Sequence, residues 1–461
     1  MNDSILTRSK KNKITSYFTT ARLLLLGFLS IILVGTLLLL LPISTKKGLS
    51  INFIDALFTA TSATCVTGLT IVSTAGTFSA FGQVVILILV QIGGLGFMTF
   101  TSFFYSMLGR KFSLKRRRNM SEDMAPQSGM QNLRNIAIKI ILIAFGFEAL
   151  GVIFLTIGFC IQGLPFGKSL WFGIFHSVSA FCNSGFDIVS MTDTSLIDYN
   201  NNYLILLTIA LLVGVGSVGF IVLVDISEHK RFSKWSLHTK VVILMTTVLI
   251  FGGAFIFWLA ERNNPDTIGN MPLLTQWVNC YFHSISCRTA GFANVPVEKM
   301  SNVSIFLSIA YMLVGAAPGS AGGGIKVTTL YIIIAYVIAT LRQKKEYVVD
   351  KKAIGTNTLA KAACTVLLAI FILFISCMLI FATESSKGKE DFFPLLFTQI
   401  SAYSTCGLAM NPMPELSTFS RLVIIVDMYL GKVGAFTFFM SFAKTNREQT
   451  KIKYPEANIN V

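Results

Sequence analysis

The stretch FTATSATCVTGL (Phe58–Leu69) returns three more times along the chain in altered form. Each copy begins with Phe, has Ser four residues later, and reaches Gly nine or ten residues after the Phe. The glycines are separated by 117, 106 and 116 residues. A near-constant period over most of the chain predicts an internally fourfold protein. The other copies are FHSVSAFCNSGF (Phe175–Phe186), FHSISCRTAGF (Phe282–Phe292) and FTQISAYSTCGL (Phe397–Leu408).

The composition predicts a polytopic membrane protein. Of 461 residues, 53% are hydrophobic and 13% are charged, and the mean hydropathy is +0.68. A soluble protein of this size cannot bury so much apolar surface, and apolar runs of about 20 residues are long enough to cross a bilayer. The first run, Leu23–Leu41, has no small-residue cleavage site after it, so we expect a retained helix and not a signal peptide.

Each copy lies between two apolar helices. The copy itself is about a dozen residues from its lead-in to the Ser, too short to span a membrane, so we expect it to be re-entrant. The predicted fold is an all-α membrane protein with four tandem repeats of helix, pore helix, filter and helix. Eight transmembrane helices and four re-entrant pore helices would then be arranged with pseudo-fourfold symmetry. The helices before the copies are expected at 22–41, 134–161, 240–260 and 359–382, and those after at 79–108, 201–226, 303–341 and 419–442.

The net charge of +16 is interpreted as a topology signal. Basic residues cluster near both termini and in the short loops KFSLKRRR (Lys111–Arg118), HKRFSK (His229–Lys234) and RQKKE (Arg342–Glu346). Lys and Arg in short loops mark the cytoplasmic side, so we expect both termini in the cytoplasm. This distribution does not favour nucleic acid as a partner, whereas contact with an acidic protein or anionic lipid stays open.

Four stretches of non-helical backbone at membrane depth indicate an ion path. Such backbone is tolerated only where it is buried in protein or lines a watery cavity. Carbonyl oxygens around an axis can replace the hydration shell of a monovalent cation, and glycine allows the φ > 0 angles that turn them to one side. No expected lining residue is a carboxylate, which argues against a calcium-type metal site. The expected lining residues are Val66, Thr67, Gly68, Asn183, Ser184, Gly185, Thr289, Ala290, Gly291, Thr405, Cys406 and Gly407.

The stretches TCVTGL, SAFCNSGF, SCRTAGF and YSTCGL resemble the four selectivity-filter sequences of the Trk/Ktr/HKT superfamily of potassium transporters. The resemblance covers nearly all of the chain and is strongest to the membrane subunit of the Ktr type. It implies a potassium-channel-like arrangement of the four repeats and a location in the plasma membrane of a bacterium. It also implies potassium uptake by a homodimer with one pore per protomer, under a cytoplasmic ring of nucleotide-binding RCK (KTN-type) subunits. Family members with Ser in place of the first filter glycine tend toward sodium, so Gly68 favours potassium. A sodium-permeable or sodium-coupled transporter of the same fold is the alternative.

A glycine-rich break, VGAAPGSAGGGIKVTT (Val314–Thr329), interrupts the apolar helix after the third copy. The other repeats have shorter motifs there, IGGLGF (Ile92–Phe97), GVGSVGF (Gly214–Phe220) and GKVGAF (Gly431–Phe436). A mobile segment below a filter can obstruct ions or swing aside, and its position matches the family's intramembrane gating loop. We therefore expect residues 315–326 to be the gate, with a packing kink as the alternative. The expected gate residues are Gly315, Pro318, Gly319, Gly322, Gly323, Gly324, Lys326 and Lys432.

Two lysines favour the gate over the kink. Lys326 lies deep in an expected span, where a cation is costly and usually functional. Lys432 lies in the corresponding motif of repeat 4, where the family typically has an Arg that resembles an electrostatic barrier below the filter. Lysine keeps the charge but loses the planar fork that holds several carbonyls.

The remaining signals are weaker. GVGSVGF fits G-x-G-x-x-G but lacks the strand and the distant acid of a dinucleotide site, so we expect no nucleotide site in this chain. Arg288 is expected to brace the third filter by hydrogen bonds to the backbone or to a carboxylate such as Asp187. Glu148 is an intramembrane acid with a functional or interface role. No cluster of acids, histidines or nucleophiles suggests an enzyme, and the expected ligand is the transported potassium ion, with sodium as the alternative.

These expectations divide the chain into repeats and cytoplasmic segments. The repeats are 22–110, 134–227, 240–342 (with the gating loop 315–326) and 359–443, and the cytoplasmic segments are 1–21, 111–133, 228–239, 343–358 and 444–461.

Overall fold

The structure is a computed structural model of the chain, and it describes residues 20–96, 133–189, 195–343, 348–349, 352–385, 392–410 and 415–442. The expected cytoplasmic segments 1–21, 111–133 and 444–461 lie almost entirely outside the described residues. The described chain is helical, as predicted, apart from a two-residue antiparallel ladder between β1 (Val348–Val349) and β2 (Lys352–Ala353).

Each repeat begins with a long outer helix. Among the described residues, four helices are long and apolar enough to cross a bilayer, and they are these outer helices. Their outward faces carry exposed apolar side chains such as Leu142, Phe251 and Leu367, a surface that suits lipid and not water. The outer helices are α2 (Thr20–Leu39), α8 (Leu133–Ile161), α12 (Leu237–Glu261) and α16 (Thr356–Ser385).

A shorter helix, which we call the pore helix, follows in each repeat. These helices have 12 to 16 residues, fewer than a span requires. Each pore helix contains the recurring Phe. Its side chain is buried in all four copies and packs behind the stretch that follows the helix. The pore helices are α3 (Phe53–Cys65), α9 (Phe166–Phe181), α13 (Leu273–Ser286) and α17 (Phe392–Tyr403).

An inner helix completes each repeat, and all four begin at a side-chain N-cap. The capping residues are Ser79, Asn202, Ser301 and Ser417, each of which accepts a hydrogen bond from the backbone N–H three residues later. The inner helices are α5 (Ala80–Leu95), α10 (Tyr203–Val218) with α11 (Phe220–Glu228), α14 (Asn302–Leu313) with α15 (Val327–Leu341), and α18 (Thr418–Val433) with α19 (Ala435–Phe442). Short helices connect these elements: α4 (Thr74–Thr77), η1 (Pro42–Ser44), η2 (Ile197–Tyr199), η3 (Phe232–Lys234) and η4 (Val297–Lys299).

Two of the inner helices are sharply bent. The angle is 91° between α10 and α11 and 90° between α18 and α19. By length and composition, the described residues contain four spans, or up to six if each bent pair counts as one. The predicted total of eight spans therefore remains a prediction.

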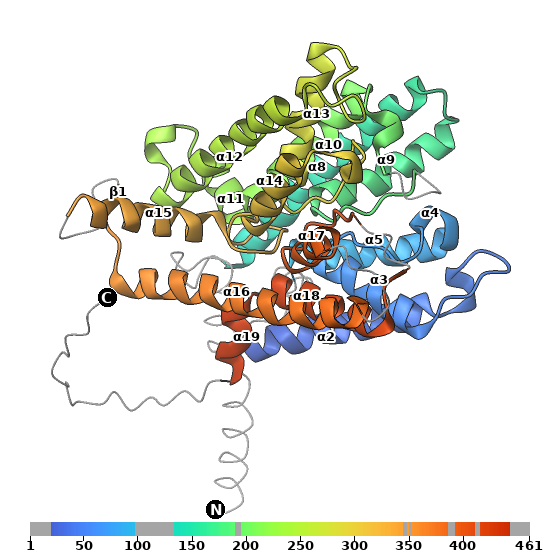
Figure 1. Cartoon of the computed structure of the whole chain (residues 1–461). Coiled ribbons are helices and arrows are strands. Elements are labelled where there is room, and N and C mark those ends of the chain that lie inside the picture. The colour runs from blue at the N-terminus through green and yellow to red at the C-terminus, as the bar shows by residue number, and fades with distance from the viewer. Residues whose placement is uncertain are drawn as a thin grey trace, which may run out of the picture.

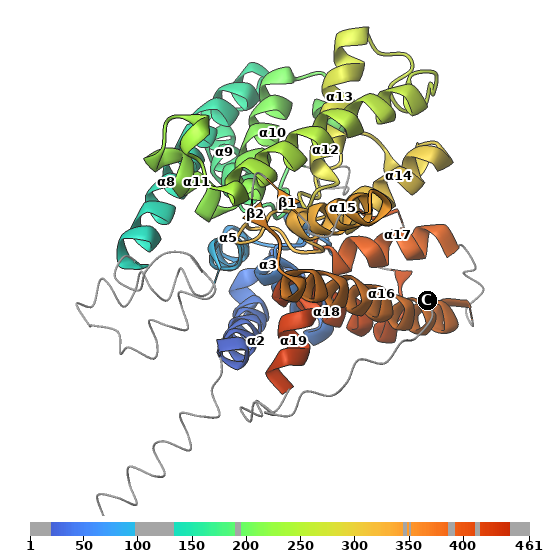
Figure 2. The same cartoon turned by 90° about the vertical axis from the view of Figure 1, so that its left-hand side faces the viewer.

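The repeats close into a ring. The inner helix of each repeat contacts the pore helix of the next: α5 contacts α9, α10 contacts α13, α14 contacts α17, and α18 contacts α3. Figures 1 and 2 show the first and last repeats side by side, with α2 next to α19. The Tyr429 hydroxyl donates to the Leu25 carbonyl at 2.8 Å, and Arg421 pairs with Asp55 at 2.9 Å. The fourth repeat is thus joined to the first.

Candidate ion-conduction site

The backbone after each pore helix repeats one unusual conformation. A left-handed non-glycine residue lies two positions before a glycine whose φ is also positive. A non-glycine residue in this region costs about 1–2 kcal/mol, so four in one register are not accidental. The pairs are Val66 (φ 58°) with Gly68 (87°), Asn183 (55°) with Gly185 (74°), Thr289 (68°) with Gly291 (76°), and Thr405 (52°) with Gly407 (101°).

The recurring serine ties this stretch to its pore helix. The serine carbonyl accepts a hydrogen bond from the N–H of the residue just before the filter glycine. The bond closes the end of the helix, where carbonyls would otherwise lack partners. The third copy is one residue shorter and makes the same bond across four residues instead of five. The bonds run from Thr67 to Ser62 (2.8 Å), Ser184 to Ser179 (2.7 Å), Ala290 to Ser286 (3.0 Å) and Cys406 to Ser401 (2.8 Å).

The four filter glycines surround one axis. A Cβ atom at each would lie within 2.1–2.7 Å of a carbonyl oxygen in the next repeat, closer than real Cβ atoms come, so only glycine fits. The series closes because the fourth glycine faces the first repeat. Four carbonyl oxygens therefore form a closed ring. The contacts are Gly68 with Ser184 (2.3 Å), Gly185 with Ala290 (2.7 Å), Gly291 with Cys406 (2.5 Å) and Gly407 with Thr67 (2.1 Å).

This ring is suited to a monovalent cation. Carbonyl oxygens are neutral, strongly dipolar ligands that substitute for water around such an ion. The pore helices end beside the ring, and a helix C-terminus carries negative potential. Among the described residues, no group of three or more His, Cys, Asp or Glu side chains is placed to hold a metal ion.

The inner helices approach the ring closely and then break. Gly96, Gly219 and Gly434 have φ between 81° and 98°, and α5, α10 and α18 end at them. Three residues earlier, a Cβ at Gly93, Gly216 or Gly431 would lie within 2.0 Å of a carbonyl near the end of a pore helix. The glycines of these motifs therefore allow close packing against the pore helices and end the inner helices, with bends of 91° and 90° in the second and fourth repeats.

In the third repeat the break is a loop that lies directly against the filter stretches. It leaves α14 at Val314 and returns at Ile325, and these two residues form a parallel bridge. The Gly323 N–H donates to the Thr405 hydroxyl at 2.8 Å. A Cβ at Gly322 would lie 2.1 Å from the Thr289 hydroxyl oxygen, so glycine allows the loop to approach.

The same loop is attached to the inner helix of the second repeat. The Ala317 N–H donates to the Ser217 carbonyl at 3.0 Å, and the Phe220 N–H donates to the Gly319 carbonyl at 2.9 Å. Both contacts lie at the bend between α10 and α11. The loop therefore connects repeats 2, 3 and 4.

Both lysines bond to carbonyl oxygens of the loop. The Lys326 ammonium donates to the carbonyls of Gly322 (2.6 Å) and Gly323 (3.4 Å). The Lys432 ammonium, which belongs to repeat 4, donates to the Ala321 carbonyl at 2.5 Å. These bonds offset part of the cost of holding cations at membrane depth.

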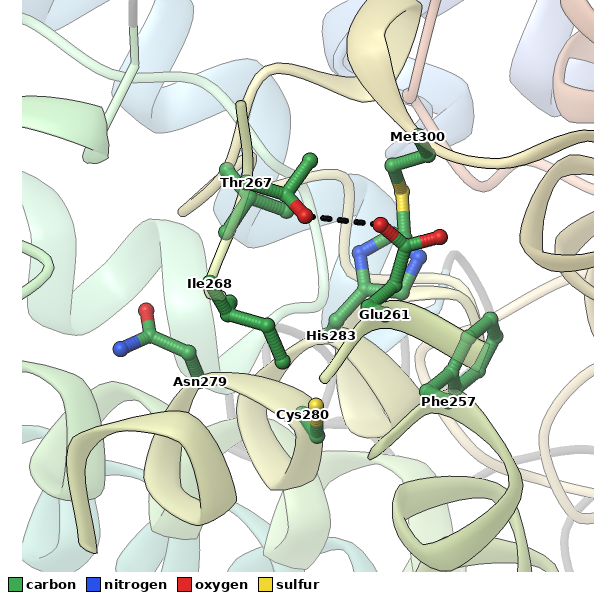
Figure 3. A pocket seen from close by; sticks show the side chains of 9 residues that line it. Phe257, Glu261, Thr267, Ile268, Asn279, Cys280, His283 and Met300 are labelled. Carbon is green, nitrogen blue, oxygen red and sulfur yellow. Dashed lines mark hydrogen bonds between the residues drawn. The ribbon is translucent and has the colours of Figure 1, made fainter. Parts of the chain in front are cut away.

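Two carboxylates missed from the sequence attach outer helices to inner ones. Glu261, at the end of α12, accepts from the N–H and hydroxyl of Ser301, the N-cap of α14, at 2.8 and 2.6 Å. Glu384, near the end of α16, accepts from the N–H of Ser417, the N-cap of α18, at 2.9 Å. The presence of an acid at the same point of two repeats was the sequence signal that could have revealed this attachment. Figure 3 shows a small cavity beside Glu261, whose carboxylate also accepts from Thr267 at 2.7 Å.

Other expected residues have mixed outcomes. Arg288 is 1% exposed, but its guanidinium makes no hydrogen bond within the described chain, so the expected brace to the backbone or Asp187 is wrong. Glu148 accepts from the Gln91 amide at 2.9 Å and so joins the first two repeats. One cysteine in each filter segment is fully buried: Cys65, Cys182, Cys287 and Cys406.

Comparison with known proteins identifies the family. The family model for TrkH, described as a cation transport protein, matches residues 9–453. The chain is a member of the TrkH family. Its family consists of transporters, so the chain is a membrane transporter and not an enzyme.

Relatives of this TrkH-family chain match it over its whole length. It is 37% identical to the Ktr system potassium uptake protein B of Bacillus subtilis, over 98% of this chain and 99% of that one. It is 35% identical to the potassium/sodium uptake protein NtpJ of Enterococcus hirae, over 97% and 98%. The crystal structure of TrkH from Vibrio parahaemolyticus matches with a TM-score of 0.67 at 17% identity, over 91% of this chain and 85% of that one. This last likeness shows the shared fold.

Proposed function

We propose that the chain is the ion-translocating subunit of a potassium uptake system in the plasma membrane, with both termini in the cytoplasm. Ions pass through the carbonyl ring formed by the four filter stretches, driven by their own gradient and the membrane potential. The observation that carries the proposal is the closure of that ring from Gly68 through Gly185 and Gly291 to Gly407. The name of the Bacillus subtilis relative, a potassium uptake protein, supports potassium as the ion.

The loop 315–326 is proposed as the gate. It contacts the filter through Gly322 and Gly323, and two ammonium groups hold its carbonyls. Ammonium groups so close to the path repel cations as well as fixing the loop. Displacing the loop would remove the obstruction together with Lys326, and it would break the bond that Lys432 of α18 makes to the loop.

Control is proposed to come from a cytoplasmic partner. Two relatives are each named as protein B of a Ktr system, which supports an assembly of several components. We propose a homodimer, one pore per protomer, under a ring of nucleotide-binding RCK subunits. The segment between α11 and α12 presents the exposed basic residues Arg231 and Lys234, which suit an acidic surface of such a ring.

The test is growth of a bacterial strain that lacks its own potassium uptake systems. The chain, produced together with its RCK partner, should restore growth at low external potassium. Growth that is restored only when sodium is added, and not at low external potassium, would contradict the proposal.

A sodium-permeable transporter is the second candidate. The Enterococcus hirae relative named for both potassium and sodium favours it. The presence of glycine at all four ring positions favours potassium. Competition between the two ions for uptake decides between them.

A further inference from the structure

Arg288 breaks the fourfold pattern at the filter. It directly precedes the left-handed Thr289, and the residues in the same register of the other repeats are small and uncharged. They are Cys65, Cys182 and Ser404. One repeat in four therefore has an arginine as the residue directly before the stretch whose carbonyls form the ring.

The guanidinium of Arg288 is buried without a hydrogen-bond acceptor among the described residues. The side chain is 1% exposed, and its Nε, Nη1 and Nη2 atoms have no hydrogen-bond acceptor in the described chain. The titratable group that interacts electrostatically with the guanidinium is the phenol of Tyr311 in α14, which is neutral at physiological pH. A guanidinium stays charged under all physiological conditions. In contrast, Lys326 and Lys432 both bond to carbonyl oxygens of the loop.

We propose that Arg288 selects ions by valence, a role that rests on the proposed conduction function. Carbonyl dipoles attract a divalent cation more strongly than a monovalent cation of the same size, so a ring of neutral oxygens is open to blockage by divalent ions. The energy of an ion in the field of a fixed charge is proportional to the ion's own charge. Arg288 therefore opposes a divalent cation twice as strongly as it opposes potassium.

The test measures rubidium uptake into proteoliposomes and its inhibition by barium, a divalent cation close to potassium in size. In the unaltered protein, barium should inhibit less effectively than potassium. Arg288→Met removes the charge and keeps much of the volume. It should lower the KM for rubidium by some factor and the inhibitory barium concentration by the square of that factor. A roughly tenfold change in KM would accompany a roughly hundredfold change for barium, since charge enters linearly in the energy.

Three variants separate charge from packing. Arg288→Lys keeps the charge and should retain both rubidium KM and weak barium inhibition. Arg288→Gln repeats the neutral test in a polar form. Arg262→Gln removes an exposed arginine at the end of α12, beside Trp258, and should change neither quantity.

Results that contradict the valence role can be distinguished from results that contradict conduction. Equal shifts for rubidium and barium in the neutral variants, or the same shifts in Arg288→Lys, would overturn the valence role while leaving conduction intact. Barium inhibition stronger than that of potassium in the unaltered protein would overturn it without any variant. Absence of rubidium uptake in the unaltered protein would refute the proposed function and this inference with it.

Discussion

The backbone N–H of Gly323 donates a hydrogen bond to the side-chain hydroxyl of Thr405 over 2.8 Å. One residue belongs to the loop that interrupts the third inner helix, and the other to the fourth filter stretch. The bond attaches the proposed gate directly to the proposed filter. Any displacement of the loop has to break it, and any change at Thr405 reaches the loop.

Thr405→Val should loosen the loop while leaving the filter backbone in place. Valine has the shape of threonine but cannot accept the Gly323 hydrogen bond, a loss of about 1 kcal/mol or more. We expect a severalfold rise in rubidium flux without the RCK partner and unchanged preference for potassium over sodium. Thr365→Val is the control, because the Thr365 hydroxyl donates to the Lys361 carbonyl of its own helix, α16. Unchanged flux in Thr405→Val would remove this bond from the gating account.

Lys432→Met should raise partner-independent flux further. It removes both the bond to the Ala321 carbonyl and a positive charge beside the path. Lys432→Arg keeps the charge and the donors, so flux should stay low. Lys168→Met, at an exposed lysine near the start of α9, controls for the loss of charge alone. If Lys432→Met and Lys432→Arg conduct equally, charge at this position does not limit flux.

Gly68→Ser should weaken discrimination against sodium. The new Cβ would lie 2.3 Å from the Ser184 carbonyl oxygen, so one side of the ring has to widen. Gly48→Ser is a matched control, because Gly48 has φ 85° against 87° at Gly68 but no atom within 4 Å of an added Cβ. Both variants place serine in a left-handed conformation, which costs about 1 kcal/mol, and only Gly68→Ser disturbs the ring. The ratio of potassium to sodium inhibition of rubidium uptake gives the answer, and equal ratios in the two variants would count against the filter.

Ser286→Ala and Ser62→Ala should differ although the two serines are equivalent in sequence. The Ser286 hydroxyl donates to the Phe292 carbonyl at 2.6 Å, whereas the Ser62 hydroxyl has no partner in the described chain. Loss of the Ser286 hydrogen bond should lower the free energy of unfolding by about 1 kcal/mol, whereas loss of the Ser62 hydroxyl should change it little. Thermal unfolding in detergent, with and without potassium, should show a lower Tm for Ser286→Ala alone. Equal shifts would mean that the hydroxyl bond does not hold the filter.

The sequence predicted the helical membrane fold and a glycine-containing stretch after each pore helix, because both depend on local chemistry. Apolar runs of span length and a repeated Phe, Ser and Gly are visible in one dimension. The ring contact between Gly68 and Ser184 was expected only as a convergence on an axis. Its closeness comes from packing between repeats.

Contacts between distant segments could not be predicted. The bonds from Gly323 to Thr405 and from Lys432 to Ala321 join residues 82 and 111 positions apart. The brace expected for Arg288 was wrong, since a general rule that buried charges find partners does not say where an exception lies. Glu261 and Glu384 were overlooked because they lie at the ends of spans, where acids are ordinary.

The most direct test is uptake of rubidium-86 into proteoliposomes that contain this chain alone, with potassium, sodium and lithium as competitors. The account predicts uptake that potassium inhibits far more strongly than sodium or lithium. Equal inhibition by potassium and sodium would contradict the claim that the four-glycine ring selects potassium, and would favour the sodium-permeable transporter.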